Sequence, residues 1–528
     1  MTIKNAGNRS NTADKSATKG KDEIEPILTS LNDNVQKIKQ TLGNSTDIVV
    51  REVFVGKDGS QAIAVIYTDG LADKIVVDDF IMNSILKHSQ IADFGDSEIP
   101  TEDLFTILKK HALTTVEILE IADYKKLFHS LLSGETIILI DGCDKGISAS
   151  TQGWKDRGVM EPSTESVIRG PREAFSETIR TNTALVRRKI KDPNLWIETK
   201  QIGHVTQTDV VIMYINGIAN DKVIEEVKIR LDRIDIDGIL ESGYIEALIQ
   251  DETYTPFPTI YNTERPDVIA AELLEGKVAI LVDGTPFVLV VPALFVSFLH
   301  SAEDYYHRAD VSSLIRLLRY LGVFISLFGP SLYVAITTYH QEMLPTQLLI
   351  SLVAQREGIP FPAFIEAIMM EVAFEILREA GLRMPRTIGP AVSIVGTLVI
   401  GQAAVEAGIV SAAMVIVVST TAIASFVFPS YDLANTIRML RFPLMALAAT
   451  FGIFGIAVGV MAIVLHLCSL RTFGVPYMSP FAPLILSDQK DAIFRAPQWA
   501  MTSRPRLISQ KNIKRANNPS SKKPGAKK

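Results

Sequence analysis

Residues 387–431, TIGPAVSIVGTLVIGQAAVEAGIVSAAMVIVVSTTAIASFVFPSY, decide the fold of this chain, because they carry one formal charge, Glu406, across two helix-lengths of apolar residues. A bilayer core needs about 20 such residues per helix. Buried helices in a large soluble core are sometimes this apolar, but two adjacent helices of this length without charged faces are rare there. We therefore predict two membrane spans joined at Glu406-Ala407-Gly408.

The composition changes along the chain. The mean hydropathy of the 528 residues is only +0.21, because a polar first half is averaged with an apolar second half. We expect an α+β and α-helical membrane protein, in which duplicated cytoplasmic α/β subdomains precede a multi-span helical membrane domain. The expected parts are a disordered tail (1–22), a first α/β subdomain (23–165), a linking helix with the second α/β subdomain (166–300), an interfacial connection (301–316), a transmembrane domain (317–486) and a basic disordered tail (487–528).

The chain shows no sign of secretion or of enzymatic chemistry. Its first 25 residues hold no apolar signal-peptide core, so we expect the soluble part to stay in the cytoplasm. The two cysteines, Cys143 and Cys468, imply no disulfide framework and no zinc site. The eight histidines are dispersed, and there is no GxSxG motif, P-loop or Gly-rich dinucleotide turn. We predict no enzyme activity, no cofactor, no metal and no nucleic-acid partner.

The soluble part contains an internal duplication. VGKDGSQAIAVIYTDGLADK, from Val55, resembles IGHVTQTDVVIMYINGIANDK, from Ile202, and LLSGETIILIDG, ending at Gly142, resembles LLEGKVAILVDG, ending at Gly284. Two matches in the same order, roughly 140 to 150 residues apart, indicate two subdomains of similar build. We expect each to hold a strand, a helix and a closing β-hairpin with an Asp-Gly turn, in mixed sheets. An amphipathic helix is predicted before them, over Glu23 to about Leu42.

The duplication changes the count of membrane spans. A hydropathy window would score Val278 to Leu299 as a span, but this stretch contains the second Asp-Gly turn. We therefore predict a hairpin over Val278 to Val291, followed by a buried or interfacial connection from Pro292 to Leu299.

A basic helix is predicted between the subdomains, within residues 166–190 and starting at Pro171. One interpretation is a solvated helix that packs the subdomains together, and another is a surface that binds lipid headgroups or another subunit. The candidate subunit contacts are Arg172, Arg180, Arg187 and Arg188.

Two long motifs resemble the A subunit of the GerA family of spore germinant receptors. They are IRGPREAFSETIRTNTALVRRKI, ending at Ile190, and IGPAVSIVGTLVIGQAAVEAGIVS, from Ile388 to Ser411, supported by SAEDYYHR at Ser301 and FPS at Phe428. The resemblance covers about Leu131 to Pro483, and neither end of the chain shows a family pattern.

The resemblance implies a germinant receptor subunit in the inner membrane of an endospore, with its N-terminal domain in the cytoplasm, the spore core. It implies a transporter-like B subunit and a lipoprotein C subunit as partners, and A subunits that assemble into an oligomeric ion channel. The nutrient germinant is expected to be sensed mainly through the B subunit and to shift the oligomer from a closed to an open pore that releases monovalent cations.

Two parts of the membrane half could serve such a pore. The helix predicted over Phe361 to Met384 carries several carboxylates, which are too costly to expose to lipid. In a symmetric assembly they would form cation-attracting rings, whereas in an amphipathic interfacial helix Glu375 would pair with Arg378, or Glu371 with neighbouring helices. The cation-attracting candidates are Glu366, Glu371 and Glu375.

The helix from Thr387 is the second pore candidate, because a partly polar stripe runs along its apolar surface. Such stripes can line a pore, with bulky side chains as a dewetting gate, although serine and threonine also bond to their own helix backbone. The pore-lining candidates are Ser393, Thr397, Leu398, Ile400, Gln402 and Glu406.

The basic residues leave the membrane topology unsettled. Arginines flank the two central spans, and the tail after Ile493 holds ten Lys or Arg and no acid. The positive-inside rule favours the cytoplasm for all of them, yet a single span over Phe442 to Leu470 sends the tail to the other side. One helix assignment is therefore in error, and we predict roughly four to six crossings with the N-terminal domain inside.

Two other membrane classes compete with a channel. A secondary transporter would show an inverted repeat in its membrane half, whereas the repeat found here lies in the soluble half. A membrane-anchored scaffold that does not itself conduct would be insensitive to changes along the polar stripe.

Overall fold

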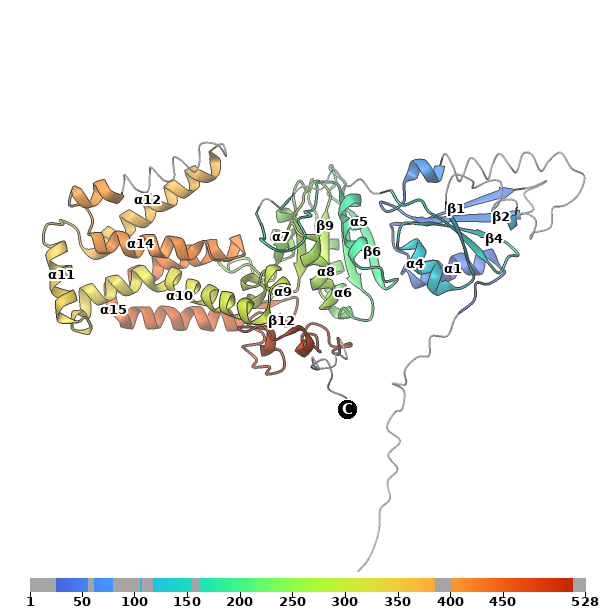
Figure 1. Ribbon diagram of the computed structural model, residues 1–528. Helices are drawn as coiled ribbons and strands as arrows, with labels where there is room; N and C mark the ends of the chain where they lie inside the picture. The colour runs from blue at the N-terminus through green and yellow to red at the C-terminus, as the bar shows by residue number, and fades with distance from the viewer. Residues whose placement is uncertain are drawn as a thin grey trace, which may run out of the picture. The chain divides into compact units, whose positions relative to one another are not determined.

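The computed structural model describes residues 25–55, 61–78, 105–106, 117–153, 161–162, 164–384 and 401–515. These residues form two compact units, of which the first holds mainly residues 25–153 and the second almost all that follow (Figure 1).

The first unit is a five-stranded sheet covered by two helices on one face. Alternate residues of its central strands point to opposite faces, so Ala64 and Ile66 pack with α1 and α4 while Ile63 and Val65 face a separate apolar cluster. The strand order is β1-β2-β4-β5-β3. The elements are α1 (Leu31–Thr41), β1 (Ile48–Val55), β2 (Gln61–Thr68), β3 (Ile118–Ile121), α4 (Tyr124–Leu131), β4 (Thr136–Ile140) and β5 (Gly146–Ala149).

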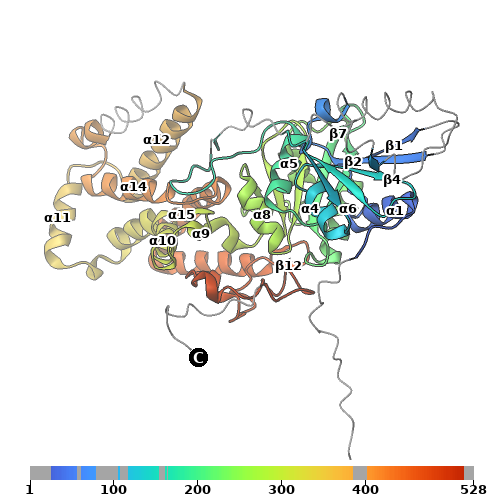
Figure 2. The ribbon, with the colours of Figure 1, turned by 45° about the vertical axis from the view of Figure 1, so that its right-hand side comes forward.

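The second unit begins with a sheet of the same design. Its strand order, β6-β7-β9-β10-β8, repeats that of the first sheet position for position. Helices α5 and α8 pack on one face and α6 and α7 on the other. Figure 2 labels α5, α6 and α8 of this subdomain. The elements are α5 (Ile179–Lys189), β6 (Leu195–Ile202), β7 (Thr208–Ile215), α6 (Asp221–Asp232), α7 (Ser242–Ile249), β8 (Tyr261–Thr263), α8 (Pro266–Leu274), β9 (Val278–Val282) and β10 (Val288–Val291).

The predicted duplication is confirmed, but the predicted mixed sheets are wrong. All strand pairs of the two sheets in the described residues are antiparallel. A short edge strand, β3 or β8, intervenes before the chain returns to the middle of the sheet, so the returning strand runs opposite to its neighbour.

The duplication also includes a helix that the sequence comparison missed. In the first subdomain the Asp141 carboxylate accepts a hydrogen bond from the Leu31 N–H at the start of α1 (2.8 Å). In the second, Asp283 accepts one from the Ile179 N–H at the start of α5 (3.0 Å). The glycines that follow these aspartates have positive φ, 82° and 90°, as tight turns require. Helix α5 is therefore the counterpart of α1 rather than a separate linking helix.

Both of these helices begin later than predicted. Helix α1 begins at Leu31 rather than Glu23, and α5 begins at Ile179 rather than Pro171. In each case an asparagine one turn into the helix bonds back to the preceding segment, because Asn34 Nδ2 donates to Leu28 O and Asn182 Nδ2 donates to Ser176 O (both 2.6 Å). These side-chain bonds replace the helical bonds of the preceding residues.

The second unit continues into a bundle of apolar helices. Two of its helices, α10 and α15, are long and apolar enough to cross a membrane, and α14 is a shorter apolar helix. Side chains such as Leu314, Phe324 and Phe454 are more than half exposed, as expected of surfaces that face lipid. The helices are α10 (Ala309–Tyr339), α11 (Thr346–Arg356), α12 (Ala363–Arg383), α14 (Ala412–Ser425) and α15 (Tyr431–Ser469).

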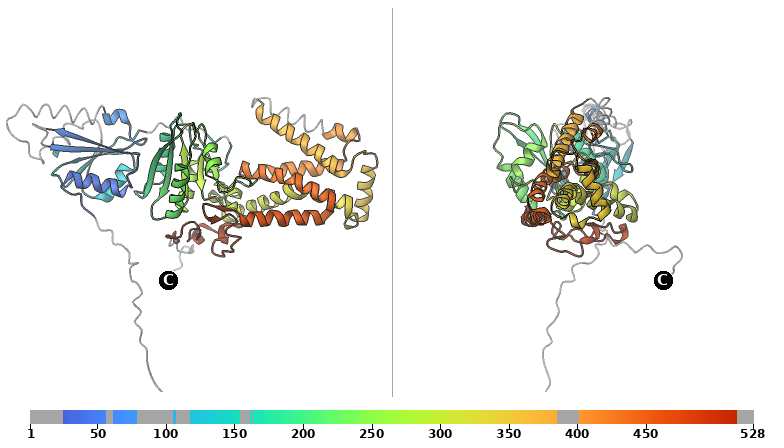
Figure 3. Two further views of the ribbon diagram at one scale, coloured as in Figure 1. Left: turned by 180° about the vertical axis from the view of Figure 1, so that it is seen from behind. Right: turned by 90° about the vertical axis from the view of Figure 1, so that its left-hand side faces the viewer.

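Helix α15 reverses direction at Gly452, whose φ of 60° and ψ of −140° are not helical. A Cβ at Gly459 would lie 2.5 Å from Leu444 Cδ2, so residues 431–451 and 453–469 pack side by side as a hairpin (Figure 3). Accordingly Thr436 on one arm and His466 on the other both bond to the adjacent residues Thr255 and Pro256. The expected single span over Phe442 to Leu470 is therefore wrong, because a glycine with positive φ ends one helix and starts the next.

The segment after α15 packs against the second subdomain. Tyr477 Oη donates to Pro258 O (2.8 Å), Arg504 Nε donates to Leu274 O (2.7 Å), and Ser509 Oγ donates to Ile218 O (2.8 Å). The tail expected to be disordered from residue 487 is thus ordered through Arg515, held by side chains that bond to backbone carbonyls. This segment holds β11 (Arg471–Thr472), β12 (Val475–Pro476), η7 (Gln489–Asp491) and η8 (Gln498–Ala500).

Candidate functional site

The second sheet joins the membrane helices through a buried connection. Strand β10 is followed by the short helices η5 (Phe295–Leu299) and α9 (Glu303–Tyr306), and α10 begins at Ala309. The predicted hairpin over Val278 to Val291 is confirmed, because β9 and β10 pair there. The predicted buried connection is confirmed too, since Val296, Phe298 and Leu299 are at most 4% exposed.

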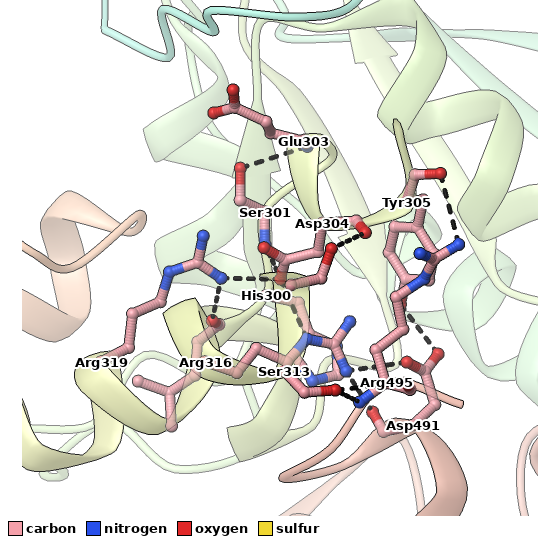
Figure 4. Close-up of polar contacts among 12 residues, drawn as sticks. His300, Ser301, Glu303, Asp304, Tyr305, Ser313, Arg316, Arg319, Asp491 and Arg495 are labelled. Carbon is pink, nitrogen blue, oxygen red and sulfur yellow. Dashed lines mark hydrogen bonds and ion pairs between the residues drawn. The ribbon is translucent and has the colours of Figure 1, made fainter. Parts of the chain in front are cut away.

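A buried carboxylate, Asp304, holds the start of α10. Arg319 Nη1 donates to Asp304 Oδ2 (2.6 Å), and Arg316 Nε donates to the same oxygen (3.0 Å) (Figure 4). The two arginines are three residues apart on α10 and therefore lie on one face of the helix. Their relative exposures are only 1% for Arg316 and 7% for Arg319, so both charges depend on this carboxylate.

The C-terminal segment completes the same cluster. Arg316 Nη1 donates to Asp491 Oδ1 (2.8 Å), and Tyr305 Oη donates to Asp491 Oδ2 (2.8 Å). Arg495 Nη1 donates to His307 O (2.8 Å). We call this cluster of Asp304, Tyr305, Arg316, Arg319, Asp491 and Arg495 the charged junction. It brings together the end of the second subdomain, the first membrane helix and the C-terminal segment.

The junction fixes the charge states of Asp304 and of the neighbouring His300. Burial raises the pKa of Asp304, but the hydrogen bond and charge of Arg319, followed by Arg316, outweigh burial and hold that pKa below its ordinary value. Burial, with the Arg316 charge, lowers the pKa of His300 from 6.5 to about 4. His300 is therefore neutral near pH 7, and its Nε2 lies 3.1 Å from Ala492 O, to which it donates.

A second buried ion pair lies among the membrane helices. Arg441 Nη1 on α15 donates to Glu371 Oε2 on α12 (2.5 Å), and Arg441 Nε donates to Ser326 O on α10 (2.8 Å). Both charged side chains are 1% exposed. The pair ties three helices together, because each charge would be costly to leave unpaired away from water.

The other carboxylates on α12 also have partners within the chain. Glu366 is fully buried, accepts a hydrogen bond from the Ser411 N–H (2.9 Å) and lies 3.4 Å from Arg356 Nε. Glu375 accepts one from Arg378 Nε (2.9 Å). The structure thus places all three cation-attracting candidates in intrachain contacts. The contacts of Glu375 and Glu371 are those of the interfacial-helix alternative, whereas the contacts of Glu366 were not predicted.

The pore-lining candidates fall into two groups. Ser393, Thr397, Leu398 and Ile400 lie outside the described residues. Residues 401–406 are helical, and a turn containing Gly408, with a φ of 66°, separates them from α14. Gln402 and Glu406 are exposed, and Gln402 Nε2 donates to Glu406 Oε1 (2.9 Å).

The four candidate subunit contacts differ in exposure. Arg172 is exposed and lies 3.3 Å from Glu161 Oε1. Arg188 Nη2 lies 3.6 Å from Glu173 Oε1. Arg180 is half-buried, and Arg187 is fully buried. Arg172 therefore offers the most accessible charge of the four.

The charged junction was missed by the sequence analysis, although part of its signal was visible. Arg316 and Arg319 are three residues apart, which puts them on one face of a helix, and they precede a charge-free apolar run. This pattern indicates two buried or interfacial charges. Their partner Asp304 lies in the SAEDYYHR motif, but Asp491 lies far along the chain in a tail that the sequence analysis treated as disordered.

Comparisons with known proteins identify the family to which this chain is similar. Residues 36–507 match the family model described as Bacillus/Clostridium GerA spore germination protein. Spore germination protein KA of Bacillus subtilis (strain 168) is 51% identical over 486 residues, which cover 92% of this chain and 88% of the relative. The uncharacterized membrane protein YfkQ of the same organism is 46% identical over 489 residues, 92% of this chain and 93% of the relative.

One solved structure is also similar in sequence. It is the crystal structure of the N-terminal domain of the A subunit of the Bacillus megaterium spore germinant receptor GerK3, 44% identical, with a TM-score of 0.42, over 52% of this chain and 98% of that chain. The family and the membrane protein YfkQ agree with the expectation of a membrane protein that is not an enzyme. This chain belongs to the GerA family of spore germination proteins.

Proposed function

We propose that this chain is the A subunit of a nutrient germinant receptor and that copies of it assemble into a germinant-gated cation channel in the inner membrane of the endospore. Membership of the GerA family supports the receptor role. The partners are a transporter-like B subunit, through which the nutrient is mainly sensed, and a lipoprotein C subunit. The channel releases monovalent cations from the spore core when the receptor is activated.

The observation that carries the channel proposal is the unequal pairing of polar groups among the membrane helices. Glu366 and Glu371 are fully buried, and both have arginine partners in the same chain. By contrast, Gln402 and Glu406 are exposed and bond to each other. An exposed amide and carboxylate on an apolar helix need water or a neighbouring protein chain rather than lipid.

A ring of copies satisfies this need. If the surface of residues 401–406 faces the axis of an oligomer, the Glu406 side chains form an acidic ring that attracts cations. The α12 carboxylates are then structural, because neutralised pairs add little to the potential along a pore. This reasoning favours the helix that contains Gln402 and Glu406 over α12 as the pore lining.

The α15 hairpin supports a topology that agrees with the positive-inside rule. Its arms, 431–451 and 453–469, lie within the range of about 17 to 25 residues found for membrane-spanning helices, the second at the lower limit. Two crossings return the chain to the side of the second subdomain. With the N-terminal domain in the cytoplasm, the basic C-terminal segment is cytoplasmic too.

The charged junction provides a path for gating. Its buried ion pairs connect the second subdomain and the C-terminal segment to α10, so a shift in the cytoplasmic part moves a membrane helix. Germinant binding would favour the open state to the extent that the assembly binds the germinant more tightly in that state.

Nutrient-triggered K⁺ release tests the proposal in spores that carry this receptor, with its B and C subunits, as their only germinant receptor. We expect Glu406→Gln to slow K⁺ release several-fold, because the acidic ring loses its charge. The matched control is Glu379→Gln, which removes an exposed carboxylate of α12 that is paired with Arg383 (2.6 Å). The control should release K⁺ like the parent at equal protein level.

Equal K⁺ release from the two variants and the parent would contradict the pore assignment. The A subunit would then be a scaffold or a transporter component beside a partner that conducts.

A further inference from the structure

Helix α11 lies at the end of the membrane helices that is remote from the second subdomain, and it runs across them rather than along them (Figures 1 and 3). It links the end of α10 at Tyr339 to the start of α12 at Ala363. Its 11 residues extend about 16 Å at 1.5 Å per residue, roughly half the thickness of a bilayer core. This helix is therefore too short to cross the membrane.

The segment that contains α11 is uncharged and largely apolar. From Met343 to Gln355 the sequence MLPTQLLISLVAQ has no charged residue. None of the residues of α11 is buried by the rest of the described chain. Met343, Ile350 and Val353 are 63%, 65% and 54% exposed. An uncharged helix that leaves its apolar side chains uncovered within its own chain indicates a contact with something apolar outside it.

One side of α11 faces the bundle of membrane helices. At about 100° per residue, Leu349, Leu352 and Arg356 fall on the same side of the helix. These three residues are half-buried, whereas the other residues of α11 are exposed. Arg356 Nε lies 3.4 Å from Glu366 Oε1, and that carboxylate is fully buried at the start of α12. The orientation of α11 about its own axis is thus fixed.

The remaining residues divide into a polar stripe and two apolar flanks. The stripe points away from the bundle and consists of residues that recur at every fourth position, Gln347, Ser351 and Gln355. Between the stripe and the bundle, Leu348 lies on one flank, and Ile350 and Val353 lie on the other. The helix therefore presents polar groups outward and apolar groups sideways.

This arrangement fits the surface of a bilayer. Helices that lie in the membrane plane place apolar side chains at the boundary between headgroups and acyl chains and turn their polar residues to water. The exposed apolar surface of α10, which includes Phe324, and that of α15, which includes Phe454, lead toward the end of the bundle where α11 lies. The flanks of α11 continue this lipid-facing surface, and lipid rather than a charged protein surface suits their lack of charge.

We propose that α11 lies in the plane of the membrane, at the boundary between headgroups and acyl chains of the leaflet opposite the second subdomain. Lipid covers its two apolar flanks, and its polar stripe contacts water. The contact of Arg356 with Glu366 holds the bundle at this level, because Glu366 also accepts a hydrogen bond from the Ser411 N–H at the start of α14 (2.9 Å). The placement requires insertion in a membrane but not channel formation, so either proposal can fail alone.

Spin-label accessibility of the full chain in nanodiscs of phosphatidylcholine and phosphatidylglycerol tests this placement. The two native cysteines are replaced by serine, and single nitroxide labels are attached at Ile350→Cys or Val353→Cys on a flank, or at Ser351→Cys on the stripe. Collisions with O₂ report the acyl region, and collisions with the chelate Ni(II)-EDDA report water. We expect the ratio of the two collision rates to be several-fold higher at the flank positions than at Ser351→Cys.

Two reference labels set the scale. Phe324→Cys on the exposed apolar surface of α10 gives the value for lipid, and Glu252→Cys, an exposed position of the second subdomain, gives the value for water. The flank labels should fall between the references, and Ser351→Cys should fall near the water value. All of these positions are exposed, so the labels remove no buried contact.

Two results would overturn the proposal. Equal ratios at the flank and stripe positions would show that α11 does not lie at the boundary. Flank labels that are shielded from both O₂ and the nickel chelate would show that another protein chain, and not lipid, covers them.

Discussion

The two α/β subdomains have the same strand order and the same Asp-Gly cap, but they differ in the polar groups buried beside their sheets. In the first, the hydroxyls of Thr136 and Thr151 lie 2.7 Å apart and satisfy each other. In the second, Asp304 is buried with Arg316 and Arg319. The two hydroxyls satisfy each other, so they require no partner from another segment. The buried charges require partners from several segments of the chain. They therefore couple the second subdomain to α10 and the C-terminal segment.

The largest expected effect comes from breaking the junction. Asp304→Ala leaves two buried guanidinium groups without their shared carboxylate and should lower the free energy of unfolding by about 3–5 kcal/mol. The matched change in the first subdomain, Thr136→Val, removes one neutral hydrogen bond and should cost about 1 kcal/mol. Thermal denaturation of the purified chain measures both, and equal losses would remove the distinction between the subdomains.

The membrane pair Arg441 and Glu371 should behave like the junction. Arg441→Met alone should destabilise the chain by about 3 kcal/mol, because it leaves a buried carboxylate unpaired. The double variant Arg441→Met with Glu371→Gln should be more stable than Arg441→Met, because no uncompensated charge remains. A double-mutant cycle on melting in detergent measures the coupling, and additive losses would show that the two charges do not interact.

The junction should also be sensitive to acid. The pKa of His300 is about 4 in the folded chain, against 6.5 ordinarily, so the unfolded state takes up a proton first as the pH falls. His300 therefore contributes a loss of stability between about pH 6.5 and pH 4, of at most about 3 kcal/mol. This loss opposes the gain from Glu165, Glu246 and Glu275, whose pKa values burial raises to about 7. The lowered pKa of Asp304 matters only at still lower pH, where that carboxylate becomes protonated.

The difference in melting temperature between His300→Gln and the parent, followed from pH 7 to pH 5, isolates the contribution of His300. Relative to the parent, His300→Gln should gain stability as the pH falls, because glutamine can donate to Ala492 O without titrating. His204→Gln changes an exposed histidine and is the control. An unchanged slope in His300→Gln would assign the acid sensitivity to another group.

The smallest effects should come from the caps, where the two subdomains are alike. Asp141→Ala and Asp283→Ala each remove one bond at the start of a helix and should cost about 1 kcal/mol. Hydrogen exchange at the first amides of α1 and α5 reports each cap separately. A much larger loss at one of the two would show that the repeated geometry no longer has the same structural role in both.

The repeated soluble architecture could be predicted from the sequence, because its signals are local. The Asp-Gly turns and their preceding apolar strands repeat in order, so the duplication and the hairpin after Val278 followed directly. The first helix of each subdomain could not be matched, because its cap comes from an aspartate more than 100 residues away.

The membrane half was less predictable. Gly452 looks like one of several small residues in an apolar run, and only its backbone conformation reveals the reversal within α15. The junction likewise required Asp491 to be brought to Arg316 across 175 positions of sequence. The pairing of Glu375 with Arg378 was foreseeable, since three-residue spacing puts them on one face of α12.

The reversal potential of the purified receptor in a planar bilayer with a KCl gradient tests the central claim most directly. We predict that the activated parent receptor reverses near the K⁺ equilibrium potential and that Glu406→Gln shifts the reversal toward zero, while Glu379→Gln does not. A parent receptor whose currents reverse identically with and without the Glu406 charge, or whose A subunit carries no current, would contradict the proposal that this chain forms the cation pore.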